Sequence, residues 1–303
     1  MTALSLPYRG PFCLAGSTRF LEGFTPARYR GTGDGALRLA LWVERSDRSI
    51  GVAVRQDDGG AVTATVDGEP PPRLAEQLAR LLSLDVDASQ YPAVAAADPV
   101  VAPLAAATPG ARPVSFWSPY EAACWAVLSQ RTSMVAAAAV KERIAARFGS
   151  VHDVEGVPVS AFPTPARLAE VAGELLVPVV KQERLRGLAE AARDERLDGR
   201  RLRGLPAEEA LAAVRELPGI GPFSAELVVV RGASAPDVFP MTEGRLHEEM
   251  AERYGLADPD LAALARIAER WQPFRTWVAV LLRSARERRT DESAQRGRQD
   301  SRN

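Results

Sequence analysis

Cysteine, lysine and long apolar runs are scarce in this chain of 303 residues. Its two cysteines, Cys13 and Cys124, are too few for a disulfide framework or a four-cysteine metal cluster. No run of 18 apolar residues exists that could span a bilayer, and the first residues lack the charged-then-apolar order of a secretory signal. We therefore expect a cytoplasmic protein with reduced thiols and no membrane contact.

The charge balance excludes a second class, the strongly basic nucleic-acid protein. Lys and Arg together number 38 against 39 Asp and Glu, a formal net charge of -1. Any nucleic-acid contact must then depend on a local patch and backbone amides. With 46% hydrophobic and 25% charged residues, the composition is that of a globular protein long enough for two domains.

Within residues 1–87, three short stretches alternate apolar and other side chains, a pattern typical of half-buried strands. Apolar side chains recur at every second position over 37–41, 50–54 and 62–66, which predicts three strands. The run Asp57-Asp58-Gly59-Gly60 predicts a hairpin turn between the last two. Leucines at helical spacing over 74–84 predict a helix that covers one face of the sheet. We expect an N-terminal α+β domain here, built on an antiparallel sheet.

The rest of the chain has helical patterns. Ser118-Pro119-Tyr120-Glu121 matches a capping box with proline at the first helical position, and the helix it begins is predicted to break near 131–133 and resume to 148. Later helices are predicted near 165, 179–194, 207–216, 222–232, 243–254, 259–271 and 274–288. Residues 85–117 predict a connecting segment with one short helix. We place an all-α domain at 88–289 and a disordered tail at 290–303.

The most informative stretch is 217–243, LPGIGPFSAELVVVRGASAPDVFPMTE. Gly219 and Gly221 can adopt backbone angles closed to other residues, so this turn can approach a ligand closely. Pro222 suits the first position of the next helix, whose leading amides point outward and suit a phosphate oxygen. Glu243 follows at the start of another helix. The spacing alone leaves two interpretations open, a turn that only caps a helix or an anion-binding turn near a carboxylate.

The whole string resembles the helix-hairpin-helix DNA glycosylases, and within them the bacterial 3-methyladenine DNA glycosylase II family. The resemblance runs from about Ser118 to Arg286, includes FPTP at 162–165 and AERWQPFRTW at 268–277, and covers the N-terminal sheet in layout only. It implies an α+β fold, an antiparallel sheet with a covering helix followed by an all-α helix-hairpin-helix bundle. It further implies a monofunctional N-glycosylase of base-excision repair that hydrolyses the bond to a flipped, damaged base, with an alkylated base as the expected substrate. Its partner would be double-stranded DNA containing that base, and we expect a monomer without cofactor or metal.

The resemblance assigns catalysis to Glu243. A glycosylase breaks the N-glycosidic bond through a transition state with positive charge on the sugar, which a carboxylate stabilises. The family has an aspartate here, and misplacing a group by ~1 Å can cost ~100-fold in rate. Thr242 is predicted to cap the next helix and to place Glu243 in its first turn, where the helix dipole favours the ionised form. The alternative is that Glu243 only complements that dipole.

The resemblance also assigns the DNA contacts. Gly219, Ile220 and Gly221 would hold the DNA backbone. Arg131, with Gln130 beside it, stands where the family has an apolar side chain that fills the gap left by the flipped base. A guanidinium can stack on and hydrogen bond to the orphaned base. An arginine that simply faces solvent at a helix break is the alternative.

Three further positions are predicted to line the base pocket. Phe223 and Arg283 stand where the family has tryptophan, and Leu227 where it has tyrosine. Loss of two stacking surfaces suggests a substrate other than a typical alkylated purine, although Phe223 could also be ordinary core packing. Phe223 also occupies the position of the lysine in strand-cleaving relatives. No lysine follows Lys181, so imine chemistry is excluded on residue type.

Two nearby residues have structural explanations as well as functional ones. His247 lies one turn after Glu243 on the same helix face, so it either tunes that carboxylate or is a surface histidine. Arg275 either meets a phosphate or pairs with an acid, and we favour the acid.

Three hypotheses remain open from the sequence. The first is the glycosylase. The second is a weak or inactive homologue that binds distorted DNA, which Glu243, Leu227 and Arg283 favour. The third is a helical scaffold unrelated to DNA, in which case DNA binding would be absent or insensitive to salt.

Overall fold

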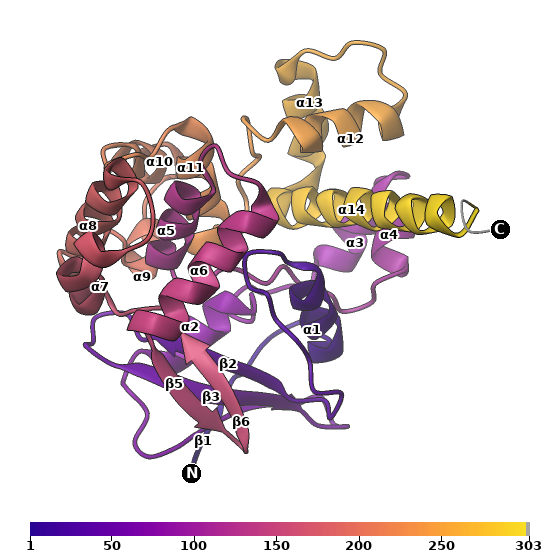
Figure 1. Ribbon diagram of the computed structural model, residues 1–303. Helices are drawn as coiled ribbons and strands as arrows, with labels where there is room; N and C mark the ends of the chain where they lie inside the picture. Colours follow the sequence, from indigo (N-terminus) through magenta and orange to yellow (C-terminus); the bar gives the residue numbers. More distant parts are fainter. Residues whose placement is uncertain (301–303) are drawn as a thin grey trace. The chain divides into compact units, whose positions relative to one another are not determined.

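The computed structural model describes the backbone of residues 1–300 and the side chains through residue 290 (Figure 1). The strands are β1 (Thr2–Ser5), β2 (Leu37–Trp42), β3 (Ser49–Gln56), β4 (Val62–Val66), β5 (Ser150–Val154) and β6 (Val157–Ala161). The first helices are α1 (Leu14–Gly23), α2 (Leu74–Leu81), α3 (Tyr91–Ala96), α4 (Val101–Ala106), α5 (Pro119–Ser129), α6 (Met134–Phe148), α7 (Pro165–Val171) and η1 (Ala172–Glu174). They are followed by α8 (Val179–Arg193), α9 (Gly199–Gly204), α10 (Ala207–Arg215), α11 (Pro222–Leu227), η2 (Val228–Gly232), α12 (Gly244–Tyr254), α13 (Leu261–Ala268), η3 (Glu269–Trp271) and α14 (Arg275–Asp300).

Contacts between residues divide the chain into two compact units. The first, called unit 1 below, comprises Met1–Asp87 and Gly110–Ala235, and unit 2 comprises Ala88–Pro109 and the residues from Pro236 onward. The sequence-based division shares the boundary after residue 87 but keeps 88–289 together. In the structure α3 and α4 belong with α12–α14, because Ala95 and Val101 are part of the same buried apolar cluster as Trp271.

The sheet of unit 1 is antiparallel with the order β1-β4-β3-β2. Leu37 pairs with Val54 and Leu39 with Val52, so the alternating apolar side chains share one face. That face packs against α1 and α2, which confirms the predicted strands and covering helix. The predicted turn between β3 and β4 is also present, with Gly60 at φ 89°. Strand β1 and helix α1 were not anticipated from the sequence.

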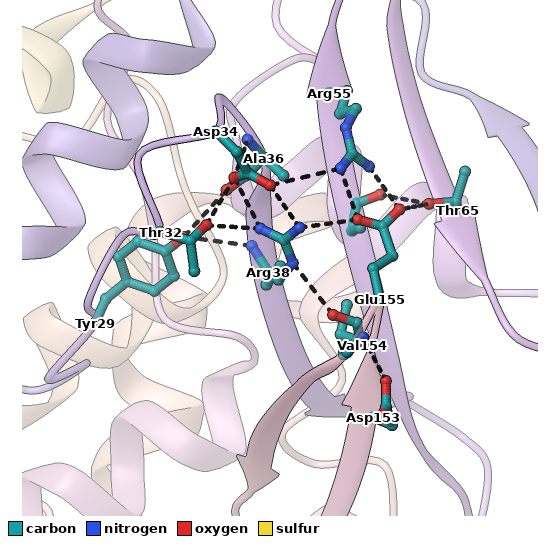
Figure 2. A network of polar contacts seen from close by, with 12 residues as sticks. Tyr29, Thr32, Asp34, Ala36, Arg38, Arg55, Thr65, Asp153, Val154 and Glu155 are labelled. Atoms are coloured by element: carbon teal, nitrogen blue, oxygen red, sulfur yellow. Dashed lines mark hydrogen bonds and ion pairs between the residues drawn. The ribbon is translucent and has the colours of Figure 1, made fainter.

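The β5–β6 hairpin, also unanticipated, packs on β2 and β3 (Figure 1). Figure 2 shows how polar groups attach it to the sheet. The buried Arg38 guanidinium donates to the Val154 carbonyl (3.2 Å), to Asp34 Oδ2 (2.7 Å) and to Glu155 Oε2 (3.1 Å). Arg55 donates two more hydrogen bonds to Glu155, of 2.6 and 2.7 Å. These groups, with Tyr29, Thr32 and Thr65 around them, are called the Arg38 network below.

Helix α5 is the most deeply buried helix of unit 1, with every side chain from Pro119 to Leu128 buried. It begins as predicted, because the Ser118 hydroxyl accepts a hydrogen bond from the amide of Glu121 at 3.2 Å. The predicted break and restart are confirmed as well, since Ser133 caps α6 and Gly149 ends it. Helices α6, α8 and α11 all pack on α5, so the segments after α5 and before α11 are held by one buried helix.

Unit 2 is a small helical cluster around Trp271, Met250 and Leu282. The buried Asp98 accepts hydrogen bonds from Tyr254 Oη (2.8 Å) and Trp271 Nε1 (3.1 Å) within it. Helix α14 continues to Asp300, over residues at which the sequence predicts a disordered tail. Ion pairs from Arg289 to Glu252 and Glu249 hold this helix against α12 close to that point. Residues 301–303 of the predicted tail lie outside the described residues. Within residues 1–300, no helix has the length and apolarity needed to cross a membrane.

Candidate functional site

The LPGIG turn joins α10 to α11 and is anchored by its apolar residues. Leu217 and Ile220 are buried, whereas Pro218 and Gly221 face solvent. Gly219 has φ 79°, a left-handed conformation that favours glycine. Gly221 is the extended N-cap of α11, and Pro222 follows at the first helical position as predicted. The first amides of α11 therefore point out of the helix at an exposed turn.

The structure brings this turn to the helix break at Gln130. The Gln130 side-chain amide donates to the Gly219 carbonyl at 2.7 Å, and its oxygen accepts from Arg184 Nη1 at 2.7 Å. A Cβ placed on Gly219 would lie 2.5 Å from Arg184 Cδ, so the arginine lies directly against the turn. Two predicted groups of DNA-binding residues thus form one contiguous surface in unit 1, and the Gln130 side chain is engaged in holding it together.

Lys181 fixes the other side of the same break. Its ammonium donates to the carbonyls of Leu128 (2.7 Å) and Gln130 (2.8 Å) and to Thr132 Oγ1 (3.2 Å). Burial and the nearby Arg184 guanidinium lower the pKa of Lys181 below its usual value. Between these contacts Arg131 has φ 53° and an exposed side chain, free of the packing that holds its neighbours. Lys181 and Arg184 were not predicted as site residues from the sequence, although both lie on one face of the predicted helix at 179–194.

The base-pocket candidates of unit 1 lie on α11. The Phe223 side chain is 50% exposed, which argues against the core-packing interpretation. Leu227 is half-buried one turn later. These two residues therefore stand on the helix that follows the turn, with an aromatic ring available at the surface.

Glu243 belongs to unit 2 and caps α12. The amides of Leu246 and His247 donate to its carbonyl, at 2.9 and 3.2 Å, so Glu243 is the N-cap residue. This corrects the expectation that Thr242 would be the cap and Glu243 part of the first turn. The difference arises because the backbone remains non-helical through Glu243, at φ -85° and ψ 82°.

The Glu243 carboxylate meets another predicted site residue. Its Oε1 lies 3.6 Å from Nε of Arg283 on α14. The same guanidinium donates to Glu287 Oε1 at 2.9 Å, one helical turn further along. The Glu243 and Arg283 side chains are only 26% and 18% exposed, whereas that of Glu287 is 58% exposed. Two positions that differ from the family pattern are thus in contact with each other.

His247 is half-buried and therefore is not the surface histidine of the structural alternative, whereas Arg275 pairs with an acid, as favoured. His247 Nε2 lies 2.9 Å from the Pro240 carbonyl, and its ring packs on Phe239. Arg275 binds Asp237 with Nε–Oδ1 at 2.8 Å and Nη2–Oδ2 at 3.0 Å, which is the favoured pairing with an acid. Asp237, the other acid of the motif, is thereby held in a two-point ion pair. Among the described residues, no group of three His, Cys, Asp or Glu side chains could hold a metal ion.

The curated proteins that this chain resembles are DNA repair proteins by name. The chain is 30% identical over 284 residues to the "Probable bifunctional transcriptional activator/DNA repair enzyme AlkA" of Mycobacterium tuberculosis, covering 91% of this chain and 55% of that protein. It is 31% identical over 183 residues to "DNA-3-methyladenine glycosylase 2" of Escherichia coli, covering 58% and 61%. The chain thus spans little more than half the length of these curated relatives. No family model matches it.

Solved structures share the fold. The 3-methyladenine DNA glycosylase of Archaeoglobus fulgidus superimposes with a TM-score of 0.73 at 22% identity, over 93% of this chain and 97% of that one. The 8-oxoguanine glycosylase/lyase of Clostridium acetobutylicum in complex with double-stranded DNA does so with a TM-score of 0.64 at 16% identity, over 89% and 92%. At these identities the likeness concerns the fold, which confirms the α+β glycosylase architecture.

Proposed function

Since the chain belongs to the helix-hairpin-helix DNA glycosylase superfamily and its AlkA-like family, we propose that it is a monofunctional DNA N-glycosylase of base-excision repair. It would hydrolyse the N-glycosidic bond of a damaged base that has been flipped out of double-stranded DNA. The names of its relatives favour alkylation damage as the general class. We further propose that it acts as a monomer in the cytoplasm, associated with the nucleoid when bound to DNA.

The observation that supports this proposal most is the joined surface at Gly219 and Gln130. A duplex needs both a grip on its backbone and a group that occupies the gap left by the flipped base. The exposed amides at the start of α11 suit phosphate oxygens, and the exposed Arg131 lies beside Gln130 to fill the gap. Because the Gln130 side chain already bonds the turn, Arg131 is the better of the two predicted gap-filling residues.

Glu243 supplies the chemistry in this proposal. As the N-cap of α12 it sits at the positive end of a helix, which favours the carboxylate form. The carboxylate would stabilise positive charge on the sugar as the bond to the base breaks, and would orient the water that adds to the sugar carbon.

The two lysines support hydrolysis over imine formation. Lys141 pairs with the buried Glu121 at 2.6 Å, and Lys181 donates to three oxygens around the helix break. An imine requires an amine that is free of such contacts and close to the sugar. The position of the lyase lysine is taken by Phe223, so water is the expected nucleophile.

The test is base release from duplexes with single lesions, measured with Glu243→Gln. Release should fall at least ~100-fold, because the charge that stabilises the transition state is lost, while the Kd for the duplex stays within about threefold. Gln130→Ala is the complementary variant, and it should weaken duplex binding about tenfold because the Gly219 turn loses its hydrogen bond.

Glu248→Gln is the matched control, since it removes an exposed carboxylate of α12 that pairs with Arg286. It should leave both release and binding unchanged. Normal release by Glu243→Gln would remove Glu243 from the mechanism. Tight binding to lesion duplexes with no release of any base by the wild-type protein would instead establish a homologue that only recognises distorted DNA.

A further inference from the structure

The contact between Glu243 and Arg283 places a second charge beside the proposed reaction centre. The carboxylate must lie next to the sugar of the flipped nucleotide to stabilise its positive charge. Arg283 Nε lies 3.6 Å from that carboxylate, and both side chains are mostly buried. The guanidinium is therefore within one side-chain width of the bond that breaks, where solvent screens it poorly. This step rests on the proposed function.

The charge matters because damaged bases fall into two electrostatic classes. A ring-alkylated purine such as 7-methylguanine carries a positive charge and leaves as a neutral molecule. An uncharged base such as hypoxanthine takes the electron pair of the glycosidic bond and leaves with negative charge. An unpaired carboxylate attracts the first class, and Arg283 offsets that attraction. A guanidinium, which donates hydrogen bonds and stays protonated, stabilises the second class as it departs.

We propose that Arg283 makes this site select a base that is uncharged before cleavage, with a carbonyl or ring nitrogen to accept from the guanidinium. The electron pair of the N-glycosidic bond passes to the base, and water adds its oxygen to the sugar carbon. The proton released by that water goes through Glu243 to solvent, and the departing base takes a proton from solvent. Arg283 thus affects which base is released, whereas Glu243 stabilises the positive charge on the sugar for every substrate.

The experiment compares release of hypoxanthine and of 7-methylguanine by the wild-type protein, Arg283→Trp and Arg283→Gln. Removing the guanidinium should raise the ratio of 7-methylguanine to hypoxanthine release about tenfold, in both variants. Arg286→Gln removes a different guanidinium of α14, one that pairs with Glu248, and as the control it should leave the ratio unchanged. Thermal unfolding monitored by circular dichroism establishes that each variant is folded, and Arg283→Gln, the smaller change, stands in if the tryptophan is not accommodated.

A binding measurement separates this inference from the proposed function. Duplexes carry either a positively charged pyrrolidine or an uncharged tetrahydrofuran in place of one nucleotide. Arg283→Gln should favour the pyrrolidine duplex over the tetrahydrofuran duplex about tenfold more than the wild-type protein does, whether or not bases are released. A ratio that changes by less than twofold overturns the role of Arg283. Absence of release from every lesion duplex, with the expected binding ratio, overturns the glycosylase activity and leaves the charge preference standing.

Discussion

The Arg38 network of unit 1 and the Glu243–Arg283 pair of unit 2 both combine arginine with carboxylates, but their geometries differ. In the Arg38 network of unit 1, one arginine with 7% of its side chain exposed reaches Asp34, Glu155 and a backbone carbonyl at hydrogen-bond distances. In unit 2, Arg283 Nε lies 3.6 Å from Glu243 Oε1, beyond hydrogen-bond range. The same guanidinium donates a hydrogen bond to Glu287. All the charged groups of the first cluster are hydrogen bonded to one another, whereas the second leaves the Glu243 carboxylate with a single long ion pair to Arg283.

This difference shows why geometry decides the role of an ion pair. A guanidinium bonded at several points joins secondary-structure elements, because removing it breaks several hydrogen bonds at once. A single long contact contributes little to folding but still changes the local potential. The Arg38 network accordingly joins the β5–β6 hairpin to the sheet, whereas the long Glu243–Arg283 contact is consistent with the electrostatic role proposed for it.

The largest expected effect comes from breaking the Arg38 network. Arg38→Ala should lower the free energy of unfolding by about 2 kcal/mol, because the carbonyl of the buried Val154 loses its donor and Asp34 and Glu155 lose a charged partner. Urea unfolding followed by circular dichroism measures it, with Arg167→Ala on the exposed face of α7 as the control. A loss equal to that of the control would show that the hairpin is held by apolar contacts alone.

Acid should weaken the same cluster. Hydrogen bonds from Arg38 lower the pKa of Asp34, and those from Arg55 lower the pKa of Glu155. A carboxylate with a lowered folded-state pKa stabilises the fold above its unfolded pKa, near 4, and loses that contribution as pH falls toward the folded value. The Tm of the wild-type protein should therefore fall more steeply between pH 6 and pH 3 than that of Glu155→Gln. Glu170→Gln, which removes an exposed carboxylate elsewhere, is the reference and should follow the wild-type protein. Equal dependence of the Tm on pH in the wild-type protein and Glu155→Gln would contradict this prediction.

The smallest expected effect comes from the Glu243–Arg283 pair. Arg283→Gln should change the free energy of unfolding by less than about 1 kcal/mol, since it removes one long ion pair and one bond to an exposed glutamate. The same urea titration measures this change beside Arg38→Ala. Were the two losses similar, the Glu243–Arg283 pair would be architectural and its effect on base choice indirect.

Local patterns were sufficient for much of the fold. Ser118 caps α5 and the Asp57–Gly60 turn closes β3 onto β4, because each depends on residues within four positions of one another. The apolar alternation of β2, β3 and β4 is preserved in the buried face of the sheet. The glycosylase resemblance likewise came from one continuous motif, and the comparisons with relatives bear out the family and the fold.

The β5–β6 hairpin shows where local patterns were too weak. Of its strand residues only Val154 and Ala161 are buried, so little apolar alternation exists to be recognised. Its turn is Glu155-Gly156, with φ of 54° and 80°, and a glutamate is an unusual residue in that conformation. The hairpin is held by contacts with residues far away in the sequence. Arg38 donates to the Val154 carbonyl, and Gly51 of β3 leaves room for the side chains of Val154 and His152.

The long helices, the antiparallel sheet, the glycine turn and the family could all be predicted from the amino-acid sequence. Those features depend on the period of apolar residues and on backbone preferences within a few residues. Three contacts became known only from the folded structure: Gln130 with Gly219, Lys181 with the helix break, and Arg283 with Glu243. Such contacts join residues far apart along the chain, and their geometry follows from how helices pack, which no local pattern encodes.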